Sequence, residues 1–171
     1  FAQRYVSMRE DENTYCSVGV FTGKNRSGDD NGALCGVVGA EGDTCPPGEF
    51  AVEPSLVVRT SRNRTHCWWV LDKPYPLAEC SEVARSIYQK HRDKGCDSGW
   101  QASKLLRVPG SVNTKYGADY PVRVEENTGA VYTLEEIKDV YPVARLEEAK
   151  KEGEAPPECD DEQLCVIEDK L

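Results

Sequence analysis

The residues best suited to chemistry lie between positions 41 and 115. An acidic pair, Glu41 and Asp43, follows a run of small and apolar residues, and Asp97 follows a segment with helical periodicity. Carboxylate oxygens suit Mg²⁺ or Mn²⁺, whereas thiolates suit softer metals. Two such ions about 3.5 to 4 Å apart could bridge an attacking hydroxyl and a triphosphate, so these carboxylates indicate phosphoryl transfer. By itself, Glu-Gly-Asp is also an ordinary turn sequence.

A histidine and its polar neighbours form a first group of candidate phosphate contacts. His66 lies in the strand-like run THCWWVLD, and the loop before it contributes Ser61, Arg62 and Arg64. Hydroxyl, guanidinium and imidazole donors in this arrangement could converge on one anionic group. An isolated histidine on a strand is more often a half-buried structural residue, so the interpretation depends on the donors around it.

A second group of polar and basic residues flanks a Pro-Gly turn at positions 109–110. Its members are Lys104, Arg107, Asn113 and Lys115. These side chains could bind a triphosphate or the phosphates of a template strand, although a solvated loop would have a similar composition. Among the three tryptophans, Trp100 is the best suited to stacking on a base, because it lies in a glycine-containing loop.

The net charge of −9 is unevenly distributed along the chain. Residues 145–171 are predominantly acidic, whereas residues 57–115 contain more Lys and Arg than Asp and Glu. The overall negative charge therefore does not exclude a nucleic-acid partner, because the distribution of charge matters more than its sum. The basic region also coincides with the two groups of candidate phosphate contacts, which favours nucleic-acid binding over a mixed solvated surface.

Composition limits the class of protein. A chain of 171 residues with 39% hydrophobic and 30% charged residues is expected to form one domain, followed here by a tail. The sequence has no apolar run of about 18 residues and no apolar signal segment, so we expect a cytoplasmic protein. Its eight cysteines lack metal-ligand spacing, which indicates free thiols. Because the chain begins at Phe1 rather than at methionine, we expect it to be cut from a longer one.

Residue periodicity predicts the strands that would position these groups. Strands are expected at residues 14–21, 33–43, 55–61, 65–72, 104–108 and 130–132. The short polar loop at 62–64 predicts that the third and fourth strands form a hairpin. Alternation along the fourth strand places His66, Trp68 and Val70 on one face and the intervening residues on the other.

Two helices are predicted, and their ends carry specific signals. Residues 77–91 have apolar side chains at helical spacing, and Gly95 is expected to stop the helix. Thr133 and Glu136 predict a capping box at the start of a second helix, which Pro142 would end. Strands and helices mix without strict alternation, so we predict an α+β fold with a largely antiparallel sheet and flanking helices.

Two segments resemble the primase-polymerases of phages and plasmids, in the archaeo-eukaryotic primase superfamily. TSRNRTHCWWVLD is similar to that family's Ser…Gly-Arg-x-His-x-Tyr-Trp-x-Leu strand-turn-strand element. GCDSGWQASKLLRVPGSVNTKYG is similar to its Asp…Leu-Leu-Arg-x-Pro-Gly-Thr-x-Asn-x-Lys segment. The order of the motifs also agrees, and the resemblance extends from about Val18 to Val124.

The resemblance implies a nucleotidyltransferase, a DNA primase or DNA polymerase, with the fold of archaeo-eukaryotic primase catalytic domains. It would use Mg²⁺ or Mn²⁺ held by Glu41, Asp43 and Asp97, the first two matching the family's usual Asp-x-Asp pair. The resemblance assigns nucleotide binding to Ser61 and His66, and the surrounding basic pocket extends this set to Arg64, Lys104, Arg107, Asn113 and Lys115.

The resemblance also implies partners and a division of the chain. Single-stranded DNA would be the template, NTPs or dNTPs the substrates, and a replicative helicase a further partner in the replication of a phage or plasmid. We expect no membrane association. Residues 1–142 would form the catalytic domain, and residues 143–171 would form an acidic linker or tail.

Two other classes of protein remain open. One is a catalytically degenerate primase-fold module that binds nucleic acid or initiates replication, which is favoured by Glu-Gly-Asp in place of two aspartates. The other is a single-stranded nucleic-acid binder that uses aromatic residues of a four-stranded sheet, although its RNP-like signature is absent. A nicking Rep enzyme is not favoured, because the sequence has no His-x-His pair.

Overall fold

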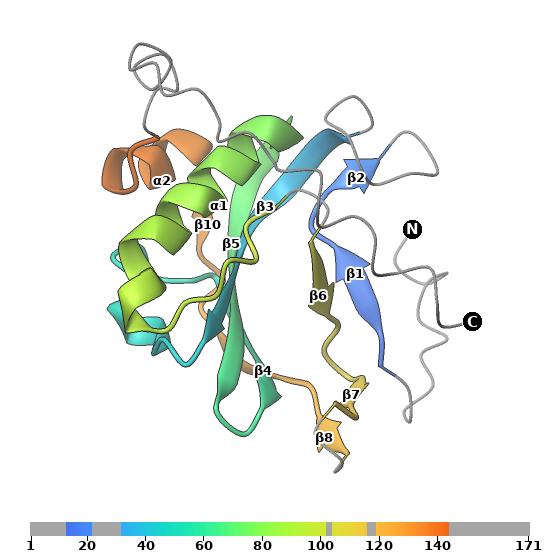
Figure 1. Ribbon diagram of the computed structural model, residues 1–171. Helices are drawn as coiled ribbons and strands as arrows, with labels where there is room; N and C mark the ends of the chain where they lie inside the picture. The colour runs from blue at the N-terminus through green and yellow to red at the C-terminus, as the bar shows by residue number, and fades with distance from the viewer. Residues whose placement is uncertain (1–12, 22–31, 102–103, 116–118, 144–171) are drawn as a thin grey trace, which may run out of the picture.

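A computed structural model of the chain describes residues 13–21, 32–101, 104–115 and 119–143 (Figure 1). The main sheet contains, in spatial order, strands β2 (Val20–Phe21), β3 (Gly32–Asp43), β5 (Arg64–Pro76), β4 (Leu56–Ser61) and β9 (Arg123–Asn127). These neighbours are all antiparallel. The short strand β10 (Val131–Tyr132) pairs in parallel with β5. The α+β class and the largely antiparallel sheet predicted from the sequence are therefore confirmed.

The remaining elements lie around this sheet. Strand β1 (Tyr15–Ser17) pairs with β6 (Leu105–Arg107), and β7 (Val112–Asn113) pairs with β8 (Tyr120–Pro121). The helices are α1 (Leu77–His91) and α2 (Leu134–Val140), with short 3-10 turns η3 (Pro47–Glu49) and η4 (Arg92–Lys94). In Figure 1, α1 and α2 lie on one side of the main sheet, and the pairs β1–β6 and β7–β8 lie on the other.

The hydrophobic core lies between the main sheet and helix α1. Cys67, Trp69 and Leu71 of β5 are buried there with Val83 and Ile87 of the helix. These β5 residues alternate along the strand, as predicted, because successive side chains of a strand point to opposite faces. The apolar face of the hairpin therefore holds the helix in place.

The opposite face of the sheet carries polar side chains and is covered by strand β6. Residues His66 and Trp68 of β5 belong to this face by alternation. Leu106 of β6 packs over β3 where that strand has a glycine, and a Cβ atom at Gly39 would lie 3.0 Å from the Leu106 Cδ1. The missing side chain at Gly39 thus lets β6 approach the sheet close to the polar face.

The end of helix α1 returns the chain to strand β3. Gly95 has a φ of 98°, a left-handed conformation that favours glycine. Its N–H donates to the Arg92 carbonyl at 3.1 Å, and its carbonyl accepts from the Thr44 N–H at 3.3 Å. The predicted glycine stop is confirmed, and it directs the segment containing Asp97 toward the end of β3.

The sequence prediction missed the two-residue strands β7 and β8 and was wrong in two further places. The single strand expected at residues 14–21 is interrupted, because β1 pairs with β6 whereas β2 pairs with β3. Strand β9 was not predicted, because all five of its residues are exposed and its sequence lacks an apolar alternation. Its position is determined by pairing with β4.

The expectations for the cysteines, the tail and membrane association can be tested only for the residues that the structure describes. The six cysteines within these ranges are free, and five of them are buried. Cys159, Cys165 and the acidic tail expected at 143–171 lie outside the described residues, apart from Val143. Within the part of the chain that the structure describes, no helix has the length and apolar character needed to cross a membrane.

We expect Thr133→Ala to destabilise the fold by about 1 kcal/mol, because it removes the cap of helix α2. The Thr133 Oγ1 accepts from the Glu136 N–H at 3.2 Å, and the Glu136 Oε2 accepts from the Thr133 N–H at 2.7 Å. Urea denaturation measures the change, with Thr133→Ser as a control that keeps the hydroxyl. Equal stability of the alanine variant and the wild-type protein would contradict a stabilising cap.

Candidate active site

Glu41 and His66 form the centre of the candidate site. They lie opposite each other on the antiparallel strands β3 and β5. The His66 Nε2 is 3.8 Å from the Glu41 Oε1, and only 8% and 16% of the two side chains are exposed. Cross-strand neighbours on one face of a sheet are held within contact distance, so the sheet itself positions this pair.

Asp97 is attached to the same point of β3 through its backbone. Its N–H donates a hydrogen bond of 2.9 Å to the Glu41 carbonyl. The Asp97 Oδ1 accepts from the Ser98 N–H at 2.7 Å, and this bond is the main reason that the pKa of Asp97 is lowered. Asp97 is therefore an exposed, ionised carboxylate next to Glu41.

Lys104 neutralises the Glu41 carboxylate. Its Nζ lies 2.8 Å from the Glu41 Oε2. Burial raises the pKa of Glu41, the bond and charge of Lys104 lower it, and the charges of Asp97 and Asp43 raise it again. The three carboxylates are thus near enough to repel one another, with Lys104 among them.

Asp43 faces a different cation. The β3–β5 register shifts between Glu41 and Asp43, and Asp43 has a positive φ of 47°. Its carboxylate makes an ion pair with the guanidinium of Arg64, at the start of β5. The two members of the acidic pair therefore belong to one neighbourhood, but they do not point at a common atom.

No three His, Cys, Asp or Glu side chains within the described ranges are arranged so that they could hold a metal ion together. Glu41 is engaged by Lys104, and Asp43 is engaged by Arg64. The donor set still suits Mg²⁺ or Mn²⁺, because it consists of carboxylate oxygens on one side of a sheet. A metal ion shared by these carboxylates would have to replace the ion pairs with Lys104 and Arg64.

Arg107 and Asn113 extend the site from β6 and β7. The Arg107 Nη2 donates to the Asn113 Oδ1 at 2.9 Å, and the Asn113 Nδ2 donates to the Thr60 carbonyl at 2.6 Å. The guanidinium also lies over the Tyr15 ring, 4.7 Å from its centroid. Arg107 is consequently held in one orientation beside the polar face.

The electrostatic environment keeps His66 neutral. Burial is the largest cause of its lowered pKa, which is about 3, and the positive charges of Arg107 and Lys104 add to the effect. The buried Nδ1 of His66 and the buried Nε of Arg107 have no hydrogen-bond partner within the described residues. Such unsatisfied buried groups are unusual and are found at functional sites.

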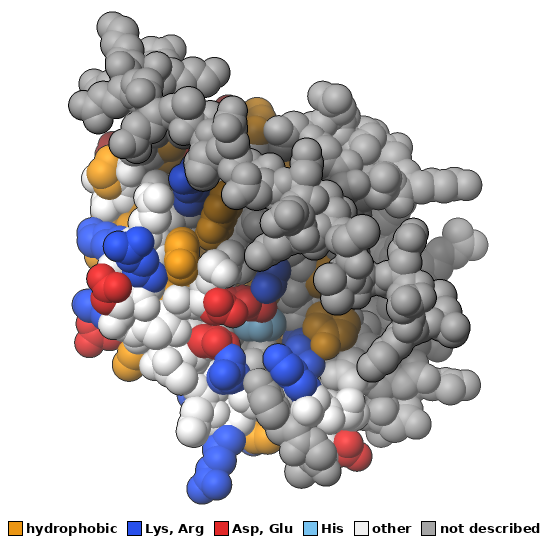
Figure 2. All heavy atoms as spheres, viewed as in Figure 1, with side chains coloured by type: hydrophobic (Ala, Val, Ile, Leu, Met, Phe, Trp, Pro, Cys, Tyr) orange, Lys and Arg blue, Asp and Glu red, His pale blue; other side chains and the backbone are white. Residues whose placement is uncertain are grey.

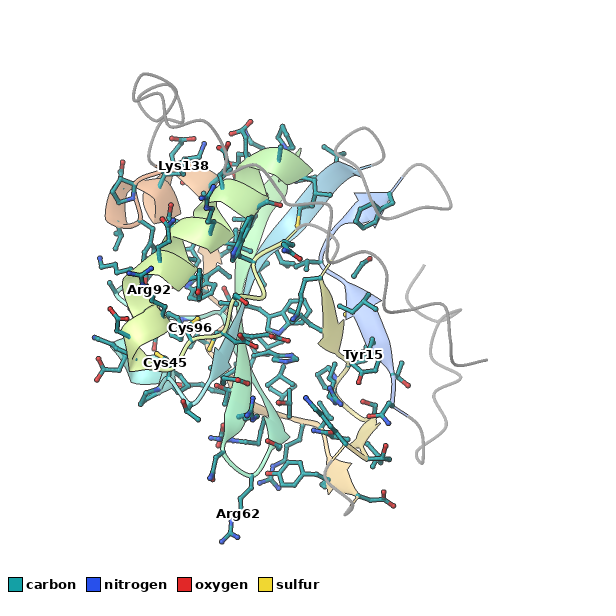
Figure 3. The ribbon with its side chains drawn as sticks, viewed as in Figure 1. Tyr15, Cys45, Arg62, Arg92, Cys96 and Lys138 are labelled. Atoms are coloured by element: carbon teal, nitrogen blue, oxygen red, sulfur yellow. The ribbon has the colours of Figure 1, made fainter. Side chains whose placement is uncertain are left out.

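The other residues expected from the sequence lie around this centre. Ser61 is buried at the end of β4, opposite Arg64. Lys115 is exposed, and its N–H donates to the Asn113 Oδ1 at 3.1 Å. Arg62 lies at the tip of the β4–β5 hairpin and points away from the sheet, so it does not join the donors near His66 (Figure 3). Its inclusion among them was wrong.

Gly99 lies next to the Glu41 carboxylate, and Trp100 follows it in the chain. Trp100 is half-buried against the core, with the Arg85 guanidinium 5.2 Å from its ring centroid, so base stacking stays a prediction. Gly99 was missed by the sequence analysis. A Cβ atom there would lie 2.8 Å from the Glu41 Oε2 and 2.9 Å from the Lys104 Cε. In the sequence, the glycine between Ser98 and Trp100 is the only sign that the chain passes so close to Glu41 and Lys104.

Figure 2 shows the result on the surface of the molecule. Acidic side chains lie beside a histidine at the centre of the view, with Lys and Arg side chains around them. The contacts of Glu41 with His66, Lys104 and the Asp97 backbone put these four residues at the centre of the patch. A strongly lowered pKa at a histidine surrounded by charged side chains marks a candidate functional site.

Comparisons with solved structures reveal similar folds. The archaeo-eukaryotic primase (AEP) domain of the cyanophage S-2L primase-polymerase matches with a TM-score of 0.60 and 20% sequence identity, over 76% of this chain and 70% of that one. The primase RepB′ matches with a TM-score of 0.50 and 19% identity, over 70% of this chain and 42% of that one. No protein-family model and no curated protein sequence matches the chain. The protein thus has the fold of an archaeo-eukaryotic primase catalytic domain.

The stability of the protein is expected to depend on pH through His66. Its pKa is about 3 in the folded protein, against an ordinary value of 6.5, so the unfolded chain binds more protons between these values. The free energy of unfolding should therefore be greatest above about pH 6.5 and fall as the pH decreases. We expect His66→Asn to make this decline shallower, by up to roughly 1.4 kcal/mol per pH unit. An unchanged slope in urea denaturation would contradict the burial of a neutral imidazole.

Proposed function

We propose that this protein is a template-directed nucleotidyltransferase, a DNA primase or DNA polymerase acting on single-stranded DNA. The observation that carries the proposal is the meeting of Glu41, Asp97 and His66 at one point of the sheet, with Lys104 and Arg107 beside them. Phosphoryl transfer depends mainly on positioning and on neutralising charge, which such a group of side chains supplies. The primase-like fold supports this choice over other phosphoryl-transfer reactions.

Glu41, Asp43 and Asp97 would hold Mg²⁺ or Mn²⁺. When bound, these ions activate the attacking hydroxyl and neutralise the triphosphate. The proposal is supported by the donor type and by the pKa of Glu41, which burial raises most and repulsion from Asp97 and Asp43 raises further. A cation shared by the three would relieve this repulsion.

The remaining polar residues would bind the incoming NTP or dNTP. A neutral His66 donates one hydrogen bond, and we assign this bond to a phosphate oxygen. Lys104 and Arg107 would neutralise the phosphates, with Arg107 oriented by Asn113. In this proposal, Arg64, Ser61 and Lys115 contact the outer phosphates or the template.

The wider organisation of the protein also belongs to this proposal. Residues 1–142 would be the catalytic domain, and the basic region at 57–115 would bind single-stranded DNA. A replicative helicase is the expected protein partner, and the cytoplasm of the host cell is the expected location.

A degenerate primase-fold module is the alternative. It is favoured by the ion pairs that Glu41 and Asp43 make with Lys104 and Arg64. Such a module would bind single-stranded DNA in a salt-sensitive manner but would show no Mn²⁺-dependent nucleotide binding. Titrating both ligands therefore separates the two functions.

The direct test is primer synthesis. We expect the protein to form labelled oligonucleotides from NTPs or dNTPs on single-stranded DNA with Mn²⁺ and without a primer. Asp97→Ala should abolish synthesis while leaving the circular-dichroism spectrum unchanged. Asp93→Ala is the matched control, because Asp93 lies four residues away with 91% of its side chain exposed. Synthesis by Asp97→Ala at the wild-type rate would remove Asp97 from the active site.

A second variant tests the role of His66. We expect His66→Ala to raise the apparent KM for the nucleotide several-fold and to lower kcat, because a phosphate contact is lost. Steady-state kinetics on a primed template measure both constants. Unchanged constants would assign His66 a purely structural role.

A further inference from the structure

We infer that Lys104 is a built-in counter-ion for Glu41, which leaves the carboxylate when a divalent cation binds. The inference rests on the proposed function and adds a coupling to it: cation binding and the position of Lys104 exclude each other. The released ammonium group then becomes available to a nucleotide phosphate. Lys104 is therefore a positioning residue that links the metal site to the nucleotide site.

The geometry assigns this role to Lys104 rather than to a general surface lysine. Its Nζ lies 2.8 Å from the Glu41 Oε2, and 29% of its side chain is exposed. The other Glu41 oxygen, Oε1, faces the His66 Nε2 at 3.8 Å. Both oxygens of the carboxylate thus have a neighbour, so a cation that takes Oε2 must displace the ammonium group.

Gly99 lets the chain pass close to the ion pair. A Cβ atom at this position would lie 3.0 Å from the Glu41 Cδ and 2.9 Å from the Lys104 Cε. Both distances are shorter than ordinary carbon–carbon contacts, so a side chain would have to displace the Glu41 carboxyl group or the Lys104 stem. The backbone at Gly99 therefore closes one side of the ion pair. The Lys104 side chain can leave Glu41 on its other, solvent-exposed side.

The charges in the site favour such an exchange. Three carboxylates near one another are costly without a cation, and Lys104 supplies one positive charge at Glu41 while Arg64 supplies one at Asp43. A divalent ion supplies two charges at a single point. If it joined the site with Lys104 still in place, like charges would lie within a few Å of each other, in surroundings that are only partly solvated.

The test is the affinity for Mn²⁺ alone, without nucleotide or DNA. Electron paramagnetic resonance measures free Mn²⁺ at about pH 8, where the carboxylates are ionised. We expect Lys104→Met to bind Mn²⁺ roughly tenfold more tightly than the wild-type protein, because the competing charge is gone. Lys104→Arg keeps the charge and should bind as weakly as the wild-type protein.

A matched control separates this effect from a change in net charge. Lys94→Met removes a lysine whose Nζ lies 2.6 Å from the Glu49 Oε2, in an exposed pair away from the site. It should leave the affinity for Mn²⁺ unchanged. If Lys94→Met and Lys104→Met strengthened binding equally, the effect would be one of net charge and the inference would be overturned.

The outcomes distinguish the inference from the proposed function. Mn²⁺ binding by the wild-type protein without a gain in Lys104→Met overturns the inference and leaves the proposed function intact. No binding by any variant overturns both.

A measurement on the wild-type protein does not depend on whether the variants fold. Bound Mn²⁺ should increase the acetylation of Lys104, read by mass spectrometry, while the acetylation of Lys94 does not change. Unchanged acetylation of Lys104 with Mn²⁺ bound would contradict its release.

Discussion

The pairing of β3 with β5 is the constraint on which the candidate site depends. It places Glu41 opposite His66 on a face that helix α1 does not cover. The Glu41 carbonyl also accepts a hydrogen bond from the Asp97 N–H, which holds an exposed carboxylate from a distant loop beside the same strand. One register between two strands therefore positions an imidazole and two acids, and a shift by one residue would turn Glu41 into the core.

Placing acids in this position has an electrostatic cost that the surrounding residues offset. Burial and neighbouring carboxylates raise the pKa of Glu41, and Lys104 opposes both effects. Asp43 makes a direct ion pair with Arg64. Side-chain cations consequently hold the acids near one another, and on our inference a divalent cation that binds Glu41 displaces Lys104.

Much of the fold follows from local patterns in the sequence. Helix α1 occupies the range predicted from periodicity, and alternation along β5 correctly separates His66 from Cys67. Strand β9 escaped prediction because its exposed residues carry no local pattern and only β4 positions it. The contacts of Glu41 with His66 and Lys104 depend on register and on the path of a loop. Such non-local contacts leave no signal in a single sequence, although the residue types indicated the chemistry.

The most direct test of the account is the position of a bound Mn²⁺ ion, located by its anomalous X-ray scattering in crystals of the protein. The account predicts a peak in contact with the carboxylates of Glu41 and Asp97, with the Lys104 ammonium turned away from Glu41. A Mn²⁺ peak elsewhere on the protein, with the Glu41–Lys104 ion pair unbroken, would contradict it.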